Sequence, residues 1–363
     1  MNRLKNFPRT LGEGPFILLF GKDLELYFKE NNLKYNIPLN FPNKTIMIKY
    51  TLNCLKILGK NSIKRLIGKL GCMKTEQIVC QILNYNDAFH VKQIINKIKD
   101  YKIFEYILIV DNHSSDNSFS ELHKLYKNIS HIKVISTPKN GGYGYGNNFG
   151  IKYAVNELHA KKAIICNPDV SFEENVVIRL TSLMNKTDAA ITSAVEVNKI
   201  PSINKAWRIP TPFAWILDET KLRNLSFKRF HYPNEYFESD YSQVDCVSGA
   251  MFLLDLNKFL NVDGYDEKMF LYGEETVLGY KFKQAGYKTY LLNSESYNHL
   301  HSASIDKSIP DKVKKIEILD QSKLYFFKNY LKENTIKYAI EKICFKYIEQ
   351  SRRIVGKIKS KMS

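Results

Sequence analysis

The segment QIVCQILNYN, residues 77–86, is a continuous apolar run that ends in polar residues. Such a run is typical of a strand buried on both faces, as in a parallel sheet. The next segment, AFHVKQIINKIKDY (residues 88–101), has apolar residues at helical spacing. Residues 105–118, EYILIVDNHSSDNS, again join an apolar run to a polar end. This order of strand, helix and strand predicts a parallel α/β unit with a right-handed crossover.

The same alternation continues along the chain. Residues 119–129 (FSELHKLYKNI) have helical spacing, and residues 131–137 (HIKVIST) predict a third strand. A further helix is predicted over residues 149–160 (FGIKYAVNELHA), followed by a fourth strand over residues 162–169 (KAIICNPD). We therefore expect an α/β fold with a mostly parallel sheet flanked by helices.

The 363 residues divide into three zones. Residues 1–75 predict a partly helical N-terminal extension, residues 76–310 hold the α/β domain, and residues 311–363 predict basic amphipathic helices. From Lys332 onward there are nine Lys and Arg residues against three Glu. Such a tail suits either an interfacial helix on anionic lipid or a helix packed on the domain. Its apolar stripe consists of Ile336, Ile340, Ile343, Tyr347, Ile354 and Ile358.

The overall charge is strongly positive. The chain has 54 Lys and Arg residues against 37 Asp and Glu, a formal net charge of +17. This excess favours anionic partners such as nucleic acid, anionic lipid or phosphorylated substrates. A codon bias toward Lys, Asn, Ile and Tyr is an alternative explanation of the same excess.

Cysteine usage and hydropathy indicate the compartment. The six cysteines form no CxxC pair and show no zinc-ligand spacing, and several lie in apolar runs, which favours a reducing compartment. We see no N-terminal signal peptide and no run of the roughly 18–20 apolar residues that a spanning helix needs. We expect a cytoplasmic protein that is soluble or lies on a membrane surface.

Polar residues follow three of the predicted strands. Because ligands bind at the carboxyl ends of the strands in such sheets, we expect these residues to converge on one crevice. Asp169, after the rigid Pro168, would be a suitable ligand for Mg²⁺ or Mn²⁺ on a diphosphate. A turn that caps the next helix is the alternative. The polar residues are Asn84, Tyr85, Asn86, Asp111, Asn112, Asn167 and Asp169.

Two later features add candidate chemistry. The glycine-rich segment TPKNGGYGYGNNFGI (residues 137–151) precedes a helix, whose N-terminus favours anions, although it matches no standard phosphate loop and could be a flexible loop. Glu274 and Glu275 begin a predicted helix, where they could complement its dipole or supply a general base. His299 and His301 alternate along a strand, so we expect only one of them to face the site.

Several segments occur in a characteristic order between residues 76 and 304. They are ILNYN (82–86), VDNHSSDNS (110–118), NGGYGYGNNFGI (140–151), CNPDVSF (166–172), VSGAMFLLD (247–255), GYDEKMFLYGEE (264–275) and HLHSAS (299–304). Together they resemble a family 2 glycosyltransferase with the GT-A fold. The resemblance is greatest to the rhamnosyltransferase-like branch that builds bacterial surface polysaccharides such as O-antigen and capsule.

This resemblance implies roles for the donor. Asp169 would hold the divalent metal, with His299 as a further ligand in place of the second Asp that many relatives carry in this motif. The nucleotide would contact Asn84, Tyr85, Asn86, Asp111, Gly142, Asn148 and Asn167, and the floor under the donor sugar would consist of Ser248, Gly249 and Ala250.

The resemblance also implies the reaction. Glu275 matches the position of the catalytic base, within a Glu274-Glu275 pair where the family usually has Glu-Asp. We expect an inverting transfer from a dTDP- or UDP-sugar, with rhamnose as a candidate, to a glycan hydroxyl on a lipid-linked intermediate. This would occur at the inner face of the cell membrane.

Other classes of protein fit parts of the sequence. A nucleotidyltransferase predicts a glycine-rich loop with a basic residue after the first strand, where this chain has ILNYNDAFH (residues 82–90). A nucleic-acid-binding protein would explain the charge, but no known binding motif is visible, so we expect no nucleic acid partner. An inactive scaffold of the polysaccharide machinery is the third alternative, against which Asp169 and Glu275 argue.

Overall fold

The computed structural model describes residues 76–197, 205–218, 220, 230–300 and 312–362. These residues belong to one compact unit. The predicted N-terminal extension, residues 1–75, lies outside the described residues, as does His301.

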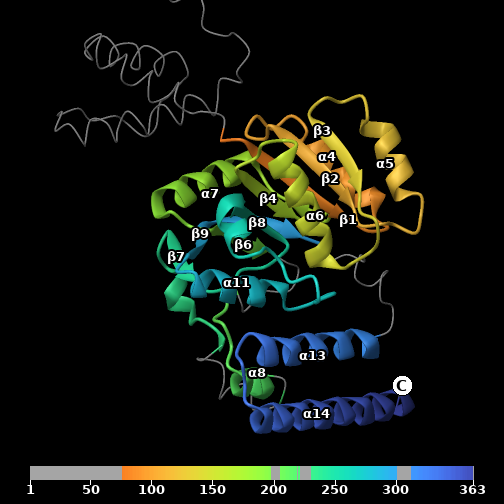
Figure 1. Cartoon of the computed structure of the whole chain (residues 1–363), viewed down its shortest axis with the longest axis vertical. Helices are drawn as coiled ribbons and strands as arrows, with labels where there is room; N and C mark the ends of the chain where they lie inside the picture. The colour runs from red at the N-terminus through yellow and green to blue at the C-terminus, as the bar shows by residue number, and fades with distance from the viewer. Residues whose placement is uncertain (1–75, 198–204, 219, 221–229, 301–311, 363) are drawn as a thin grey trace, which may run out of the picture. The chain divides into compact units, whose positions relative to one another are not determined.

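A nine-stranded mixed sheet forms the centre of the unit (Figure 1). Its strand order is β3-β2-β1-β4-β8-β6-β9-β5, with β7 paired to β9. The first four strands of this order are parallel, as expected, whereas β8 runs antiparallel to both β4 and β6. The strands are β1 (Ile78–Asn84), β2 (Tyr106–Asp111), β3 (Ile132–Ser136), β4 (Lys162–Cys166), β5 (Val170–Ser171), β6 (Ile191–Val197), β7 (Tyr241–Val244), β8 (Met251–Asp255) and β9 (Thr289–His299).

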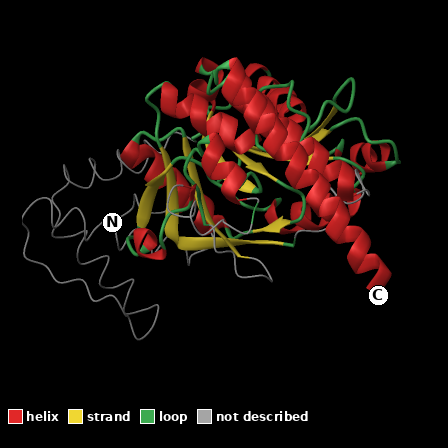
Figure 2. Cartoon of the chain, turned by 90° about the horizontal axis from the view of Figure 1, so that it is seen from below, coloured by secondary structure: helices red, strands yellow, loops and turns green. Residues whose placement is uncertain are grey.

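Helices cover both faces of the sheet, which confirms the expected α/β fold (Figures 1 and 2). β1 is apolar throughout because both of its faces are buried. Cys80 and Ile82 join the apolar cluster under α4, α5 and α7, while Val79 joins the cluster under α6, α10 and α11. The helices are α4 (Ala88–Ile98), α5 (Ser118–Tyr126), α6 (Tyr143–Asn156), α7 (Glu174–Thr187), α8 (Pro212–Asp218), the 3₁₀ helix η1 (Asn234–Phe237), α10 (Leu256–Asn261), α11 (Glu274–Gln284), α13 (Lys312–Asn329) and α14 (Thr335–Met362).

The C-terminal helices α13 and α14 pack on each other and on α8, below α11 in Figure 1. A third apolar cluster joins them to the domain through Phe327 of α13, Phe345 of α14 and Trp215 of α8. Val277 of α11 and Met269 of the preceding loop belong to the same cluster. The tail is therefore attached to the segment that carries the two candidate catalytic glutamates.

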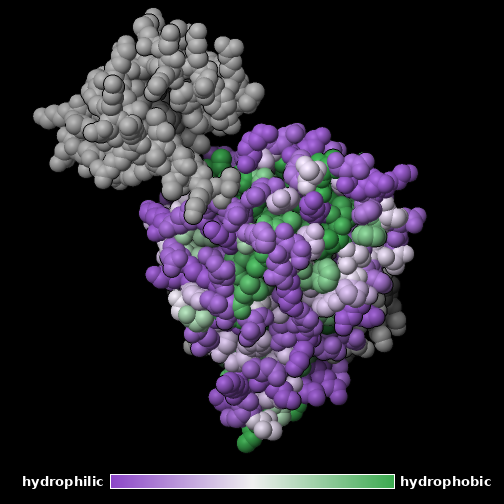
Figure 3. All heavy atoms as spheres, turned by 45° about the horizontal axis from the view of Figure 1, so that its top comes forward, coloured by the Kyte–Doolittle hydropathy of each residue, from purple (hydrophilic) through white to green (hydrophobic). Residues whose placement is uncertain are grey.

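The opposite side of α14 is exposed. Ile336 and Tyr347 are 75% and 73% exposed, and Ile340 and Ile343 are also exposed. By contrast, the surface seen in Figure 3 is mainly hydrophilic, with apolar side chains lying between polar ones. None of the described helices is both long and apolar enough to cross a membrane.

Candidate active site

Asp169 lies in the turn between β4 and β5 and is only 4% exposed. The backbone N–H of Asn167 donates to the carbonyl oxygen of Ala250 (2.9 Å), which extends the β4–β8 pairing past the end of β4. Val170 of β5 then pairs with His299 of β9. This pairing brings Nε2 of His299 to 3.2 Å from Oδ1 of Asp169.

The other nitrogen of His299 faces a second carboxylate. Nδ1 lies 2.9 Å from Oε1 of Glu196, on β6, and the hydroxyl of Tyr297 donates to Oε2 of the same carboxylate (3.2 Å). Burial alone would lower the pKa of His299, but the hydrogen bonds to Asp169 and Glu196 outweigh it and raise that pKa to about 9. At neutral pH the imidazole is therefore a cation held between two carboxylates.

A bulge in β9 creates this arrangement. Leu292 pairs with Ala194 of β6, but the next pair joins Ser296 to Val195, so residues 293–295 are passed over. Successive side chains of a strand point to opposite faces of the sheet, so the three extra residues change which face the later side chains occupy. In an unbroken register Tyr297 and His299 would lie on the other face. The bulge is held in place by Asn293, whose N–H donates to the carbonyl oxygen of Asp240 (2.8 Å).

The bulge has a second support from a helix. The guanidinium of Arg179, on α7, donates to Oε1 of Glu295 (2.6 Å), to the hydroxyl of Ser294 (2.9 Å) and to Oδ1 of Asp240 (3.0 Å). These contacts fix the residues that the register passes over.

Glu274 and Glu275 form the first turn of α11, after Gly273 in a left-handed conformation. Glu274 is only 5% exposed, and within the described part of the chain its Oε1 has no hydrogen-bond partner. Burial and the nearby charge of Glu275 raise the pKa of Glu274 to about 8. Burial also raises the pKa of Glu275, while a backbone hydrogen bond from Gly249 opposes the rise.

Gly249 is packed directly against the side chain of Glu275. A Cβ atom added at Gly249 would lie 2.5 Å from Oε1 of Glu275, so a larger residue there would displace the carboxylate from its present position. The carbonyl oxygen of Gly249 accepts a hydrogen bond from the hydroxyl of Tyr143 (2.8 Å). Ser248 and Ala250 flank this point, and the hydroxyl of Ser248 accepts from the N–H of Ala250 (3.2 Å).

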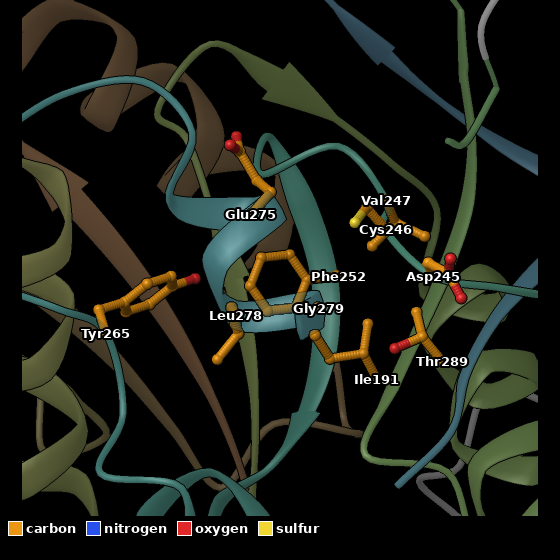
Figure 4. A pocket seen from close by; sticks show the side chains of 10 residues that line it. All are labelled: Ile191, Asp245, Cys246, Val247, Phe252, Tyr265, Glu275, Leu278, Gly279 and Thr289. Atoms are coloured by element: carbon orange, nitrogen blue, oxygen red, sulfur yellow. The ribbon is translucent and has the colours of Figure 1, made fainter. Parts of the chain in front are cut away.

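Glu275 lines a small cavity beneath the start of α11 but directs its carboxylate away from it. This cavity of about 10 Å³ is lined mainly by apolar side chains, among them Phe252, Leu278 and Val247 (Figure 4). The carboxylate of Glu275 is directed to the other side, away from Phe252 and Leu278. Gly249, against which Glu275 packs, precedes Ala250, and the carbonyl oxygen of Ala250 accepts from Asn167, two residues before Asp169. Glu275 therefore lies near the pair of Asp169 and His299, and the charge of Glu196 is a further cause that raises its pKa.

The polar residues at the ends of β1 and β2 largely bond to one another. The side-chain amide of Asn84 donates to Oδ1 of Asp111 (2.8 Å), and Ser114 donates from its hydroxyl to Oδ1 (2.6 Å) and from its backbone to Oδ2 (2.9 Å). Asp111 is 1% exposed. Asn86 is bonded to Ser115 (2.8 and 3.0 Å). These residues therefore shape the crevice wall, while Tyr85 remains partly exposed beside them.

Two residues of the glycine-rich segment contact the loop before α11. Gly142 has φ of +90°, and a Cβ added there would lie 2.0 Å from the carbonyl oxygen of Phe270. The amide nitrogen of Asn148 donates to the carbonyl oxygen of Tyr265 (2.9 Å) and to Glu267 (3.0 Å). Both amide hydrogens of Asn148 are thus used, so this side chain positions the loop and does not open toward the crevice.

The residues brought together fit a divalent metal. Asp169 would supply a carboxylate oxygen, and His299 would supply Nε2 once it loses its proton. The bond from Nδ1 to Glu196 then matches the usual support of a metal-bound histidine. Among the described residues no three His, Cys, Asp or Glu side chains are placed to hold a metal ion together, so diphosphate oxygens and water would complete the coordination.

Sequence reasoning missed Glu196, Tyr143 and Tyr297. Glu196 is the one charged residue in the strand ITSAVEV (residues 191–197), which is the signal that could have drawn attention to it. Tyr297 precedes His299 by two residues and so shares its face of β9. Tyr143 gave no distinct signal, since aromatic residues are frequent in that loop.

The fold is a mixed α/β sheet flanked by helices, and a carboxylate–histidine cluster and a glutamate lie at the carboxyl ends of its strands. Residues 82–255, just under half of the chain, match the family model described as Glycosyl transferase family 2. The low-salt glycan biosynthesis hexosyltransferase Agl10 of Haloferax volcanii is 27% identical over 205 residues. The match covers 56% of this chain and 60% of that relative, less than two thirds of its length. The matched segment is thus similar in sequence to family 2 glycosyl transferases.

A solved structure shows the same fold. The crystal structure of GalNAc-T7 with UDP, GalNAc and Mn²⁺ superposes with a TM-score of 0.50 at 15% identity. It covers 76% of this chain and 55% of that chain. The mannosyltransferase PcManGT from Pyrobaculum calidifontis, in complex with GDP-Man and Mn²⁺, gives a TM-score of 0.48 at 10% identity, covering 71% of this chain and 65% of that chain.

Substituting Gly142 tests the contact between the glycine-rich loop and the loop before α11. Gly142→Ala should lower the free energy of unfolding by about 3 kcal/mol or more, because positive φ costs about 1–3 kcal/mol and the carbonyl of Phe270 must also move. Gly286→Ala is the matched control, since Gly286 has φ of +77° but no atom within 4 Å of the added Cβ. If urea denaturation shows that both variants lose the same free energy of unfolding, the contact between Gly142 and Phe270 does not contribute to stability.

Proposed function

We propose that this protein is an inverting glycosyltransferase that uses a nucleotide-diphosphate sugar. One observation carries the proposal: Asp169, His299 and Glu196 form a hydrogen-bonded row at the carboxyl ends of the strands, and Glu275 packs against Gly249, next to the Ala250 that is bonded to Asn167. A binding protein would not require a buried row of charged groups next to a carboxylate held against glycine. The match of residues 82–255 to the family model supports the same proposal.

The reaction follows from the positions of these groups. Asp169 and Nε2 of His299 would hold Mg²⁺ or Mn²⁺, which offsets the negative charge that develops on the leaving diphosphate. Glu196 keeps the ring of His299 oriented through Nδ1. Ser248, Gly249 and Ala250 would form the floor under the donor sugar, with Gly249 fixing the carboxylate of Glu275.

Glu275 would act as the general base. It accepts the proton of an acceptor hydroxyl as the bond from that oxygen to the anomeric carbon forms and the bond to the diphosphate breaks on the opposite face. Because its pKa is raised, ionised Glu275 is a stronger base than an ordinary glutamate. Glu274, with a pKa of about 8, is mostly protonated at neutral pH and is the weaker candidate.

The motifs and the relative indicate the chemical class of the donor and of the acceptor. A dTDP- or UDP-linked hexose or deoxyhexose, with rhamnose as the candidate, fits the resemblance of the sequence motifs. The relative of Haloferax volcanii is named a hexosyltransferase of glycan biosynthesis, which supports a hexose donor and a growing glycan as acceptor. We propose a lipid-linked intermediate of a bacterial surface polysaccharide as that acceptor.

We also infer that α14 rests on an anionic membrane surface. Its exposed face presents Ile336, Ile340, Ile343 and Tyr347, and Lys337, Lys342 and Lys346 lie on the same helix. Apolar groups next to lysines suit the interface of an anionic bilayer. This would place the enzyme at the inner face of the cell membrane, where a lipid-linked acceptor is available.

The assignment of the base can be tested with a matched pair of variants. Nucleotide release is first measured with UDP-, dTDP- and GDP-sugars, a lipid-linked acceptor and Mg²⁺ or Mn²⁺. With the accepted donor, Glu275→Gln should lower kcat by about 10²–10⁴-fold and leave donor binding unchanged. The kcat of Glu274→Gln should stay within about tenfold of the parent value, because glutamine resembles the protonated acid.

Two outcomes would contradict this proposal. If no nucleotide is released from any sugar donor of the panel, the protein is not a sugar transferase of this class. If kcat falls more in Glu274→Gln than in Glu275→Gln, Glu274 and not Glu275 is the general base.

A further inference from the structure

A groove of about 590 Å³ lies between the end of β1, the loop before α11 and the helix α13. It is separate from the small cavity beneath Glu275. Its volume is within the range of pockets that hold molecules the size of a nucleotide. The groove is lined by Tyr85, Asn140, Lys268, Met269, Phe270, Lys314, Ile318, Gln321, Ser322 and Tyr325.

The charged groups of the groove are cations. Lys268 belongs to the loop before α11 and Lys314 to the first turn of α13, and neither forms an ion pair with any residue in the described ranges. Lys314 is exposed. Two lysines without acidic partners, on different walls of one groove, favour a ligand with several negative charges.

Hydrogen bonds fix α13 against the loop that carries Lys268. Asp266 accepts from the hydroxyls of Tyr325 (2.9 Å) and Tyr330 (2.7 Å). The hydroxyl of Ser322 donates to the carbonyl oxygen of Leu271 (2.9 Å). These hydrogen bonds join the two walls of the groove at several points, so the folded structure fixes the distance between the walls.

The same loop is fixed on its other side to the glycine-rich segment. The backbone N–H of Tyr143 donates to the carbonyl oxygen of Phe270 (3.2 Å), and Phe270 lies against Gly142. Asn140, which lines the groove, accepts from the side-chain amide of Asn112 (3.1 Å). The groove is therefore continuous with the ends of β1 and β2, where a nucleotide is expected.

Building on the proposed function, we propose that Lys268 and Lys314 bind the diphosphate of the nucleotide donor, with Tyr85 and Asn140 against its nucleoside. On this account α13, which lies outside the segment matched by the family model, is a wall of the donor site. A phosphate on the acceptor is the other source of the same chemistry. The donor is favoured because Tyr85 and Asn140 follow β1 and β3, on the nucleotide side of the crevice.

The test measures binding of nucleotides to the full chain by calorimetry. UDP, dTDP and GDP are compared, each with its nucleoside. Lys314→Gln and Lys268→Gln should each weaken binding of the preferred diphosphate by about tenfold, the effect of one charge-assisted hydrogen bond, and leave nucleoside binding unchanged. Lys328→Gln, on the same helix but outside the groove lining, is the control and should bind as the parent does.

The possible results separate this proposal from the proposed function. If the parent binds a diphosphate and both lysine variants bind it within twofold of the parent, α13 is not part of the donor site. A rise in acceptor KM with unchanged diphosphate affinity would overturn the proposal in favour of the acceptor phosphate. If the parent binds none of the three diphosphates, the protein does not use a nucleotide-diphosphate sugar of these types, and the proposed function itself is wrong.

Discussion

The site depends on the pairing of β9 with two neighbours. Through β5 this strand brings His299 to Asp169, and through β6 it brings the same ring to Glu196. The three residues that the register passes over decide which face His299 occupies. Without that bulge the imidazole and Tyr297 would point to the other side of the sheet, and two buried carboxylates would lose the cation between them. Such uncompensated burial of charge is costly.

A second constraint acts through the loop of residues 264–273. It is held by Asn148 of α6, by the glycine-rich segment at Gly142 and by Tyr325 and Tyr330 near the end of α13. The loop leads directly into Glu274 and Glu275. The glycine-rich segment, the two glutamates and the C-terminal helices are therefore joined through one short segment, so a change in any of these contacts should shift the position of the glutamates.

Much of the architecture could be predicted from the sequence. Apolar runs with polar ends gave the first four strands and their parallel order, because a strand covered on both faces needs apolar residues throughout. β8 is also an apolar run with a polar end, but such a run does not show that the strand pairs in the antiparallel direction. Asp169 and His299, predicted as partners from the resemblance, do lie side by side. Their role as metal ligands remains a prediction.

Other parts of the site could not be read from the sequence, for identifiable reasons. The partnership of Glu196 with His299 depends on a bulge that no local pattern announces. Asn148 and Asp111 resemble nucleotide ligands in sequence, yet their side chains bond mainly to neighbouring protein groups. The groove along α13 arises only when the tail folds back on the loop before α11.

The most direct test of the central claim is a crystal structure of the full chain with Mn²⁺ and the nucleoside diphosphate that it binds. The account predicts an anomalous manganese peak in contact with Asp169 and Nε2 of His299, with Glu196 still bonded to Nδ1 and the diphosphate completing the coordination. A metal bound elsewhere, or a diphosphate bound away from this pair, would contradict it.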